Sequence, residues 1–337
     1  MKNYFLLAIA TLYVSNANAQ PGIVEILALN DSLVQVSVEL PNGNTGSGSG
    51  VVVSKEYVAT NCHVLANAKG ASISKYRDSH RPIALKADWK HDLCLLKFDG
   101  LPFKPVAMRD SLNLQYEEEV FSLGYPVGNN VPQPSFGYVK GSYPLDDSVI
   151  IRTNAAFGLG SSGGALFDQQ FNLIGITSFK SPGSQGYFYS LPVEWIKRLF
   201  DAPDIISLNT NDIPFWALPL EQRPYFMQIV IPYQNHEWAF LKEIAQAWTG
   251  QEPRSADAWY FLGLAEEGES RITQAKENFT KAQQLNTRHL DAMIALSKIA
   301  YTQSDLSALE QLKAQILPIS QLQAEVIAEK ISDLKNH

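Results

Sequence analysis

Residues 24–200 consist of short runs of β-prone residues separated by turn residues, and this pattern constrains the fold more than any other feature. The runs are rich in Val, Ile, Leu, Phe and Tyr, while Gly, Pro, Asn and Asp punctuate them. Many short strands without helical periods between them favour a β-sandwich or a β-barrel over a parallel α/β sheet. Clear examples of the runs are 33–40, 50–53, 57–60, 93–98, 119–123, 149–153 and 173–179.

A Gly- and Ser-rich stretch, 46–50, leads into one of these strands. We interpret it as a turn that permits two backbones to approach closely. It lacks the Lys and the following Ser or Thr of a phosphate-binding loop, so we do not expect a phosphate site there.

The character of the sequence changes after Leu199. Four prolines fall within residues 202–224, which predicts a linker that lies over a surface. From residue 236 onward the chain is rich in Ala, Leu, Glu, Lys and Gln, with apolar residues three and four positions apart. This spacing predicts a series of helices.

One stretch of this helical half has the spacing of a helix pair in a repeat protein. Small residues there let two antiparallel helices approach, while large ones fill the seam between them. The residues that carry the spacing are Trp259, Leu262, Gly263, Ala275, Phe279 and Ala282. Over residues 235–317 the sequence therefore resembles the tetratricopeptide family, with one good repeat and two poor ones. An unrelated small helical bundle is the alternative, because a solenoid needs about three repeats for stability.

The N-terminus has the pattern of a signal peptide. Lys2 precedes an apolar run at 4–14, and 17–19 has the small-x-small form of a cleavage site. We expect cleavage after Ala19 and a periplasmic or secreted bacterial protein; an uncleaved anchor or a buried strand is the alternative. No later stretch approaches about 18 apolar residues, so we expect no stable membrane insertion after the signal is removed.

Charge and metal-ligand spacing exclude several classes of function. The net charge is −7 and no long basic run interrupts it, which makes nucleic acid and anionic membrane surfaces poor partners. The His and Cys residues do not cluster with the spacing of a zinc site. We expect neither a metal nor a cofactor.

The sequence Gly-Leu-Gly-Ser-Ser-Gly-Gly-Ala-Leu at 158–166 gives the strongest indication of chemistry. A serine that attacks an amide must stand on a tight turn, with backbone N–H groups aimed at the developing oxyanion. Ser162, followed by two glycines and an apolar run, is the candidate nucleophile, and Ser161 is the alternative. We expect the N–H groups of Gly160 and Ser162 to form an oxyanion hole, with Ser161 contributing to its geometry.

Two further segments supply a candidate base and a candidate acid. His63 follows the β-prone run 57–62, and Asp92 directly precedes the apolar run 93–96. A carboxylate that fixes the imidazole tautomer lets histidine take the serine proton efficiently. Asp88 and Asp99 also flank the apolar run, but neither stands immediately before it.

The order His63, Asp92, Ser162 within a β-rich domain resembles the trypsin-like proteases, in particular the bacterial Deg-type, or high-temperature-requirement, branch. The resemblance covers residues 44–200. It implies a mainly β, double six-stranded barrel, here followed by a smaller all-α helical-repeat domain. It also implies a serine endopeptidase that cleaves protein or peptide substrates through an acyl-enzyme, and the N-terminal pattern adds that this enzyme is exported.

The resemblance extends to the substrate cleft. It implies that Ser178 lies behind the Asp92 carboxylate and that Phe179 and Lys180 line the entrance of the specificity pocket. Gly186 corresponds to the opposite wall, and Ala156 and Phe157 to the base. Since no acid stands at that base, we expect cleavage after an uncharged, small or aliphatic residue; the alternative is that these are only core strand residues.

Two departures from the family limit what can be carried over. Animal digestive relatives have an acid just before the nucleophile, whereas this chain has Ser161, so activation by N-terminal cutting is not expected. Deg-type enzymes usually carry PDZ domains, and nothing after Phe200 reads as one. Their chaperone activity and oligomer-gated regulation are therefore not assigned here.

The two cysteines of the chain flank the candidate base and acid. If His63 and Asp92 are hydrogen-bonded, Cys62 and Cys94 come close enough to bridge. In an oxidising compartment this predicts a disulfide, and two buried free thiols are the alternative.

These observations predict four segments. They are a signal peptide at 1–19, a trypsin-like protease domain at 20–200, a linker at 201–234 and a tetratricopeptide-like helical domain at 235–337. The alternative function is an interaction or scaffold protein, in which the helical repeats bind a protein partner and the barrel is regulatory or inactive.

Overall fold

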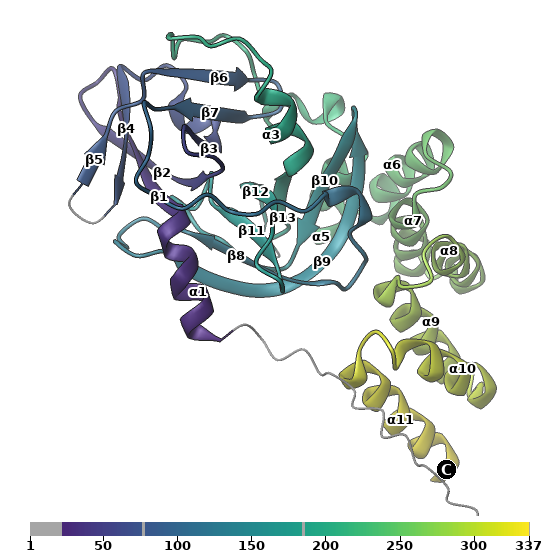
Figure 1. The fold of residues 1–337 in the computed structure, drawn as a ribbon. Coiled ribbons are helices and arrows are strands. Elements are labelled where there is room, and N and C mark those ends of the chain that lie inside the picture. Colours follow the sequence, from purple (N-terminus) through teal and green to yellow (C-terminus); the bar gives the residue numbers. More distant parts are fainter. Residues whose placement is uncertain (1–21, 76–77, 184–185, 337) are drawn as a thin grey trace, which may run out of the picture.

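The computed structural model describes residues 22–75, 78–183 and 186–336. The predicted signal peptide lies outside these residues. The described chain forms two β-sheet units side by side, followed by a row of helices that lies beside the second unit (Figure 1). Within the described residues, no helix is both long and apolar enough to cross a membrane.

The first unit is a seven-stranded antiparallel sheet with the order β5-β4-β1-β2-β3-β7-β6. Burial alternates along strand β1, because Val34, Val36 and Val38 are buried and the residues between them are more exposed. The strands are β1 (Leu33–Glu39), β2 (Thr45–Val52), β3 (Tyr57–Asn61), β4 (Gly70–Lys75), β5 (Asp78–His80), β6 (Ala84–Asp88) and β7 (Leu93–Lys97). A short helix, α1 (Ile23–Leu29), precedes the sheet.

The second unit is a closed six-stranded barrel with the order β10-β13-β12-β11-β8-β9. Its strands are β8 (Glu119–Gly124), β9 (Gln133–Leu145), β10 (Ser148–Thr153), β11 (Ala165–Asp168), β12 (Leu173–Lys180) and β13 (Phe188–Pro192). Helix α3 (Val193–Leu199) follows the last strand and buries Trp195 and Ile196. The expected mainly β, trypsin-like class is confirmed, with one correction: the second unit is a closed six-stranded barrel, whereas the first is a seven-stranded sheet and not a second closed six-stranded barrel.

The interpretation of residues 46–50 as a turn is wrong. They lie inside β2, where Gly50 pairs with Val34 of β1. The close approach is real, since a Cβ on Gly48 would stand 3.1 Å from the carbonyl oxygen of Ser162. The glycines serve packing between elements rather than a change of chain direction.

The C-terminal part is helical from Tyr225 to Asn336. Its helices are α4 (Tyr225–Gln228), α5 (Val230–Gln234), α6 (Trp238–Gln251), α7 (Ala256–Gly268), α8 (Ile272–Leu285), α9 (Leu290–Thr302), α10 (Leu306–Ile316) and α11 (Gln321–Asn336). Helices α7 and α8 pack with Gly263 against Phe279, where a Cβ on the glycine would meet the ring at 2.6 Å. The helical region is thus confirmed, while its tetratricopeptide identity stays a prediction.

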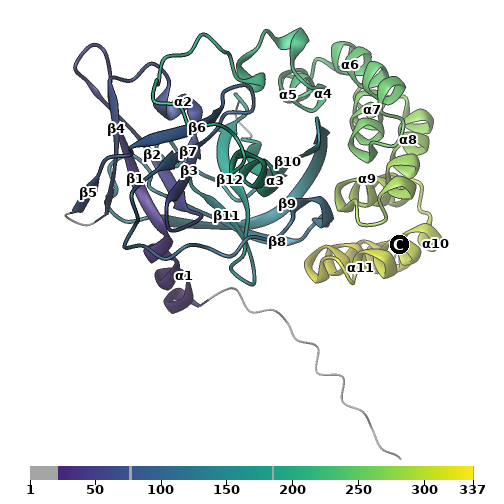
Figure 2. The same ribbon diagram turned by 45° about the horizontal axis from the view of Figure 1, so that its top comes forward.

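The row of helices lies beside the second barrel in both views (Figures 1 and 2). A buried ion pair joins the two, because Arg152 of β10 lies 3.9 Å from Asp257 of α7. His289 donates from Nε2 to Asp257 Oδ1 at 3.0 Å, because its Nδ1 accepts the backbone N–H of Ala292. Burial opposes ionisation of Asp257, yet the charge of Arg152 and the hydrogen bond from His289 lower the pKa of Asp257 below its ordinary value.

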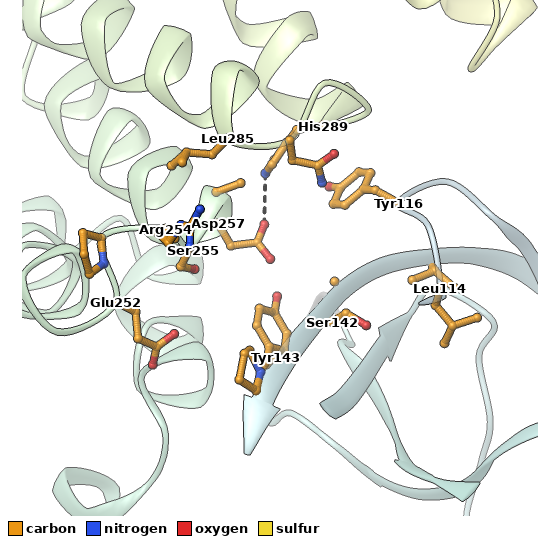
Figure 3. Close-up of a pocket in the computed structure, with 16 residues that line it drawn as sticks. Leu114, Tyr116, Ser142, Tyr143, Glu252, Arg254, Ser255, Asp257, Leu285 and His289 are labelled. Atoms are coloured by element: carbon orange, nitrogen blue, oxygen red, sulfur yellow. Dashed lines mark hydrogen bonds and ion pairs between the residues drawn. The ribbon is translucent and has the colours of Figure 1, made fainter. Parts of the chain in front are cut away.

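A cavity of about 590 Å³ lies between the barrel and the helices. Figure 3 shows Tyr143 of β9 facing Asp257 of α7 and His289 across it. None of the predicted catalytic residues lines this cavity.

Candidate active site

The predicted base and acid lie next to each other at the end of the first sheet. His63 stands in a single helical turn, α2 (Cys62–Leu65), that follows β3 directly. Asp92 stands in the turn before β7, the strand that pairs with β3. Its backbone has φ +62°, a region that aspartate tolerates better than most residues. The antiparallel pairing of β3 and β7 therefore brings together two residues that are 29 positions apart.

His63 and Asp92 make two hydrogen bonds. Asp92 Oδ2 lies 2.7 Å from His63 Nδ1, and Asp92 Oδ1 accepts the backbone N–H of His63 at 2.8 Å. An ionised carboxylate only accepts, so the hydrogen of the neutral ring sits on Nδ1 and leaves Nε2 as a free base. The Asp92 side chain is fully buried, whereas 30% of the His63 side chain is exposed. The candidate base is thus partly exposed, while the carboxylate that binds it is shielded from solvent.

Two more donors reach the same carboxylate. The Ser178 hydroxyl donates to Asp92 Oδ2 at 2.7 Å, which agrees with the position expected for it behind the acid. The indole N–H of Trp216 donates to the same oxygen at 3.1 Å. Sequence reasoning missed Trp216, because it belongs to the predicted linker and no motif surrounds it.

Ser162 lies in the loop before β11, between the two units. Its hydroxyl donates to the carbonyl oxygen of Ser178 at 3.2 Å. Among the described residues it makes no hydrogen bond with His63, so the structure forms the His63–Asp92 part of the predicted triad and leaves the Ser162–His63 contact unmade. Catalytic hydrogen bonds are often long or misaligned in free enzymes, so this geometry does not count against Ser162.

The loop around Ser162 requires glycine at two places. Gly160 and Gly163 have φ values of +88° and +85°. A Cβ on Gly160 would stand 2.7 Å from the carbonyl oxygen of Tyr125. The N–H of Ser161 donates to Gly158 O at 3.1 Å, whereas the N–H groups of Gly160 and Ser162 donate to no partner within the described part of the chain. These two N–H groups are available to an oxyanion.

Ser49 of β2 anchors this loop to the first sheet, and sequence reasoning missed it as well. Its N–H donates to Ser162 O at 2.7 Å and its hydroxyl donates to Gly160 O at 2.8 Å. The same hydroxyl accepts the N–H of Tyr125 at 2.8 Å. The run of small residues in β2 was the only signal, and it indicates close packing without naming the partner.

The residues expected to form the specificity pocket do not all line the same cavity in the structure. Ala156 and Phe157 line a cavity of about 90 Å³ that Ser178, Phe179, Lys180 and Gly186 do not line. The Phe157 ring lies edge-on to Phe188, at 5.2 Å between centroids, and a Cβ on Gly186 would meet the Phe188 ring at 2.9 Å. The Phe188 ring therefore lies next to both the expected base and the expected wall.

Cys62 and Cys94 form the predicted disulfide, with their Cα atoms 5.0 Å apart. The bridge ties the helical turn that carries His63 to the strand that begins beside Asp92. Among the described residues, no group of His, Cys, Asp and Glu is arranged to hold a metal ion.

Replacing both cysteines by alanine is expected to lower the free energy of unfolding. The bridge closes a segment of 32 positions, and a loop of that size contributes about 2–4 kcal/mol through the entropy of the unfolded chain. Urea denaturation of the wild type and of the double variant measures the difference. Two reactive thiols in the denatured, non-reduced wild type would show that the bridge does not form.

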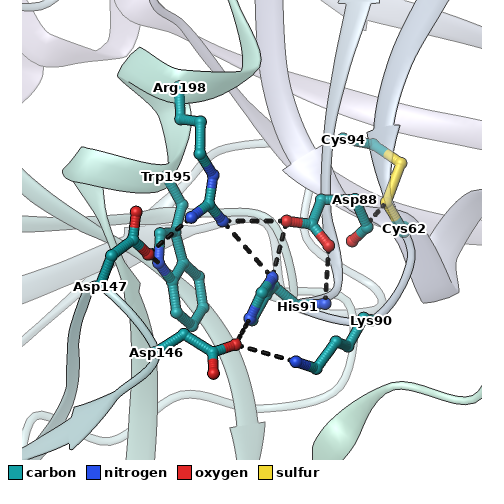
Figure 4. A network of polar contacts seen from close by, with 9 residues as sticks. All are labelled: Cys62, Asp88, Lys90, His91, Cys94, Asp146, Asp147, Trp195 and Arg198. Carbon is teal, nitrogen blue, oxygen red and sulfur yellow. Dashed lines mark hydrogen bonds and ion pairs between the residues drawn. A yellow bond between two sulfur atoms is a disulfide. The ribbon is translucent and has the colours of Figure 1, made fainter. Parts of the chain in front are cut away.

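A second His–carboxylate cluster lies one residue away from Asp92 (Figure 4). His91 contacts Asp88 through Nδ1 and Asp146 through Nε2, each at 2.7 Å. Arg198 of α3 contacts Asp88 at 3.1 Å, and the Trp195 ring lies 4.1 Å from the His91 ring. The cluster connects the turn before β7 to the second barrel and to α3, so it fixes the chain that presents Asp92.

This cluster makes stability sensitive to acid. Burial raises the pKa of Asp88, but the hydrogen bonds and charge of His91 and the charge of Arg198 outweigh it and hold that pKa below the ordinary value. A depressed carboxyl pKa contributes stability above the ordinary value of about 3.9, and this contribution is lost as the pH falls through the folded-state pKa. The wild type should therefore exceed Asp88→Asn in free energy of unfolding at pH 7, and the gap should narrow below about pH 4. Urea midpoints measured from pH 7 to pH 3 test this, and a gap independent of pH would contradict it.

The match to a known family falls within the two β units, from β2 to β12. Residues 48–176 match the family model described as "Trypsin-like peptidase domain". The chain is 30% identical over 256 residues to "Serine protease Do-like HtrA" of Bacillus subtilis, covering 67% of this chain and 57% of that protein. It is 32% identical over 155 residues to a "Probable periplasmic serine endoprotease DegP-like" of Pseudomonas putida, covering 44% of this chain and 32% of that protein. The chain thus spans less than two thirds of the length of either relative.

Among solved structures, the active form of the Rv3671c protease from M. tuberculosis shares the fold. The TM-score is 0.50 at 20% identity, and the match covers 57% of this chain and 92% of that one.

Proposed function

We propose that this protein is a serine endopeptidase that cleaves proteins or peptides, since residues 48–176 match the family model of a trypsin-like peptidase domain. The observation that carries the proposal is the buried Asp92 carboxylate, which lies 2.7 Å from His63 Nδ1 and leaves Nε2 of a partly exposed imidazole without a bond to the acid. Burying a carboxylate costs free energy unless hydrogen-bond donors surround it, and a barrel without catalytic activity would gain nothing from this arrangement. The arrangement therefore favours an enzyme over the alternative of an inactive scaffold.

The reaction we propose begins with a rotation of the Ser162 side chain. The hydroxyl leaves Ser178 O and turns to His63 Nε2, which removes its proton as Oγ attacks the substrate carbonyl. The free N–H groups of Gly160 and Ser162 stabilise the oxyanion. The imidazolium, supported by Asp92, then protonates the leaving amine, and the acyl-enzyme forms.

The second half of the reaction reverses these roles. A water molecule gives a proton to His63 Nε2 and attacks the acyl carbonyl. As the tetrahedral intermediate collapses, the bond between the acyl carbon and Ser162 Oγ breaks, the imidazolium returns the proton to Oγ, and the acid is released. No step requires a metal or a cofactor.

Labelling with a fluorophosphonate probe tests the proposal. We expect a single covalent adduct on a peptide that contains Ser162, because only an activated serine reacts with such a probe. Ser161→Ala is the matched control, since it removes the neighbouring hydroxyl and should still be labelled. Absence of labelling in folded wild-type protein would overturn the proposal.

The preferred cleavage site is part of the proposal. Ala156 and Phe157 offer no negative charge to a substrate Lys or Arg, so we propose cleavage after uncharged residues, as the sequence predicts. The Phe188 ring, next to Phe157 and Gly186, supports a preference for small side chains. A peptide library in which Lys or Arg dominates at the cleaved position would contradict this assignment.

We also propose that the enzyme acts in the periplasm or outside the cell. The N-terminal pattern of residues 1–19 and the periplasmic name of a relative support this. The mass of the protein recovered from the producing cell should correspond to a chain that begins at Gln20. A protein partner for the helical region remains a prediction.

A further inference from the structure

Trp216 comes from the segment that connects the second barrel to the helices, yet it lies against the His63–Asp92 pair. It stands in a single 3₁₀ turn, Phe215–Ala217. Its indole N–H donates to Asp92 Oδ2 at 3.1 Å, and its ring lies edge-on to the His63 ring at 5.4 Å between centroids. One side chain thus contacts both members of the pair.

Contacts of the segment with the two β units hold Trp216 in place. Phe215 is buried and its N–H donates to the carbonyl oxygen of Lys90, in the turn that carries Asp92. Phe179 of β12 stacks on the Trp216 ring at 5.6 Å and meets Phe215 edge-on at the same distance. Further upstream, Ile205 forms a β-bridge with Leu85 of β6. The indole is therefore a fixed donor rather than a chance contact of a loose loop.

The Asp92 carboxylate needs the donors that surround it. It is fully buried, and a buried polar group needs hydrogen bonds to replace the water it has lost. Oδ2 faces the Ser178 hydroxyl, the Trp216 indole and His63 Nδ1. The indole therefore helps to hold this oxygen where it receives the His63 hydrogen, while the ring edge limits the tilt of the imidazole.

We propose that Trp216 is a positioning residue for catalysis, acting through the Asp92 carboxylate and the orientation of His63. This inference rests on the proposed function, because it assigns a role in the same reaction. It also means that the segment leading into the helical region supplies part of the environment of the acid. The barrel residues by themselves do not complete it.

Trp216→Phe tests the proposal in the full-length protein, since phenylalanine keeps an aromatic ring and removes the donor. We expect kcat to fall about tenfold, the size expected for one hydrogen bond to a charged group, with KM changed less than about twofold. Trp259→Phe is the matched control. Its indole N–H donates to the carbonyl oxygen of Pro253, just before helix α7, and not to a triad residue, so its loss should leave kcat unchanged.

A second readout does not depend on turnover. We expect the proton between His63 Nδ1 and Asp92 to give a downfield proton resonance. This resonance should move, and its proton should exchange faster with water, in Trp216→Phe but not in Trp259→Phe. If Trp216→Phe fails to fold, 3-benzothienylalanine at position 216 keeps the shape of the indole and replaces its N–H with sulfur. The same two results are expected.

The outcomes separate this inference from the proposed function. An active wild type, with Trp216→Phe equal to Trp259→Phe in kcat and in the downfield resonance, would overturn the role of Trp216 alone. A wild type without hydrolysis or labelling would overturn the proposed function. In that case an unchanged resonance in Trp216→Phe would also overturn the positioning role, whereas a shifted one would support it.

Discussion

Replacing Ser162 with alanine is expected to lower kcat by about 10⁶-fold, the size of effect measured when a triad enzyme loses its nucleophile. Without Oγ no acyl-enzyme can form, and only the oxyanion hole and substrate binding remain. The fold should survive, because the lost hydroxyl makes a single hydrogen bond, to Ser178 O. Hydrolysis of a peptide substrate, followed together with the thermal unfolding midpoint, measures both effects.

The control for this variant is Ser161→Ala. Ser161 is buried and holds its neighbours through its backbone, whose carbonyl oxygen accepts the Thr177 hydroxyl at 2.7 Å. Its side chain has no role in the proposed reaction, so most activity should remain. Full activity in a folded Ser162→Ala protein would rule out Ser162 as the nucleophile.

Replacing Asp92 with asparagine is expected to lower kcat/KM by about 10⁴-fold at neutral pH. Each Asp92 oxygen accepts at least one donor, from His63 N on one side and from His63 Nδ1, Ser178 and Trp216 on the other. An amide presents an NH₂ group to one of these sets, where it opposes existing donors. If it faces Nδ1, the imidazole shifts its hydrogen to Nε2 and can no longer accept the serine proton.

Asp99→Asn controls for the loss of one negative charge near the same strand. Asp99 follows β7 and is exposed, so its substitution should leave kcat/KM unchanged. Equal activities for Asp92→Asn and Asp99→Asn, with both proteins folded, would show that Asp92 does not orient the base.

Much of the β architecture could be predicted because strand patterns are local. The runs at 33–40, 57–60 and 93–98 agree closely with β1, β3 and β7. Strand β9 was not predicted, since Gly, Pro and Ser interrupt its sequence. Residues 46–50 were misread for the same reason: glycine signals a turn locally, but here it lets a strand pass close to Val64 and Ser162.

The candidate site was also predicted only in part from the sequence. The spacing around His63, Asp92 and Ser162 identified the residues with the right chemistry, and the structure places the first two at 2.7 Å. The Ser162 hydroxyl points to Ser178 O instead of His63, a side-chain rotation that no sequence pattern specifies. The pocket residues were likewise named by resemblance, while the Phe188 ring beside Phe157 became visible only in the fold.

The sequence by itself determined which groups can react and which strands carry them, because strand periodicity and the glycines of a tight turn are properties of neighbouring residues. Only the tertiary structure decided what surrounds those groups. Trp216 reaches Asp92 across 124 positions, and Ser49 holds the Ser162 loop from another sheet. Contacts of this kind depend on how the two β units and the connecting segment close upon each other, and a residue carries no local mark of a partner so far along the chain.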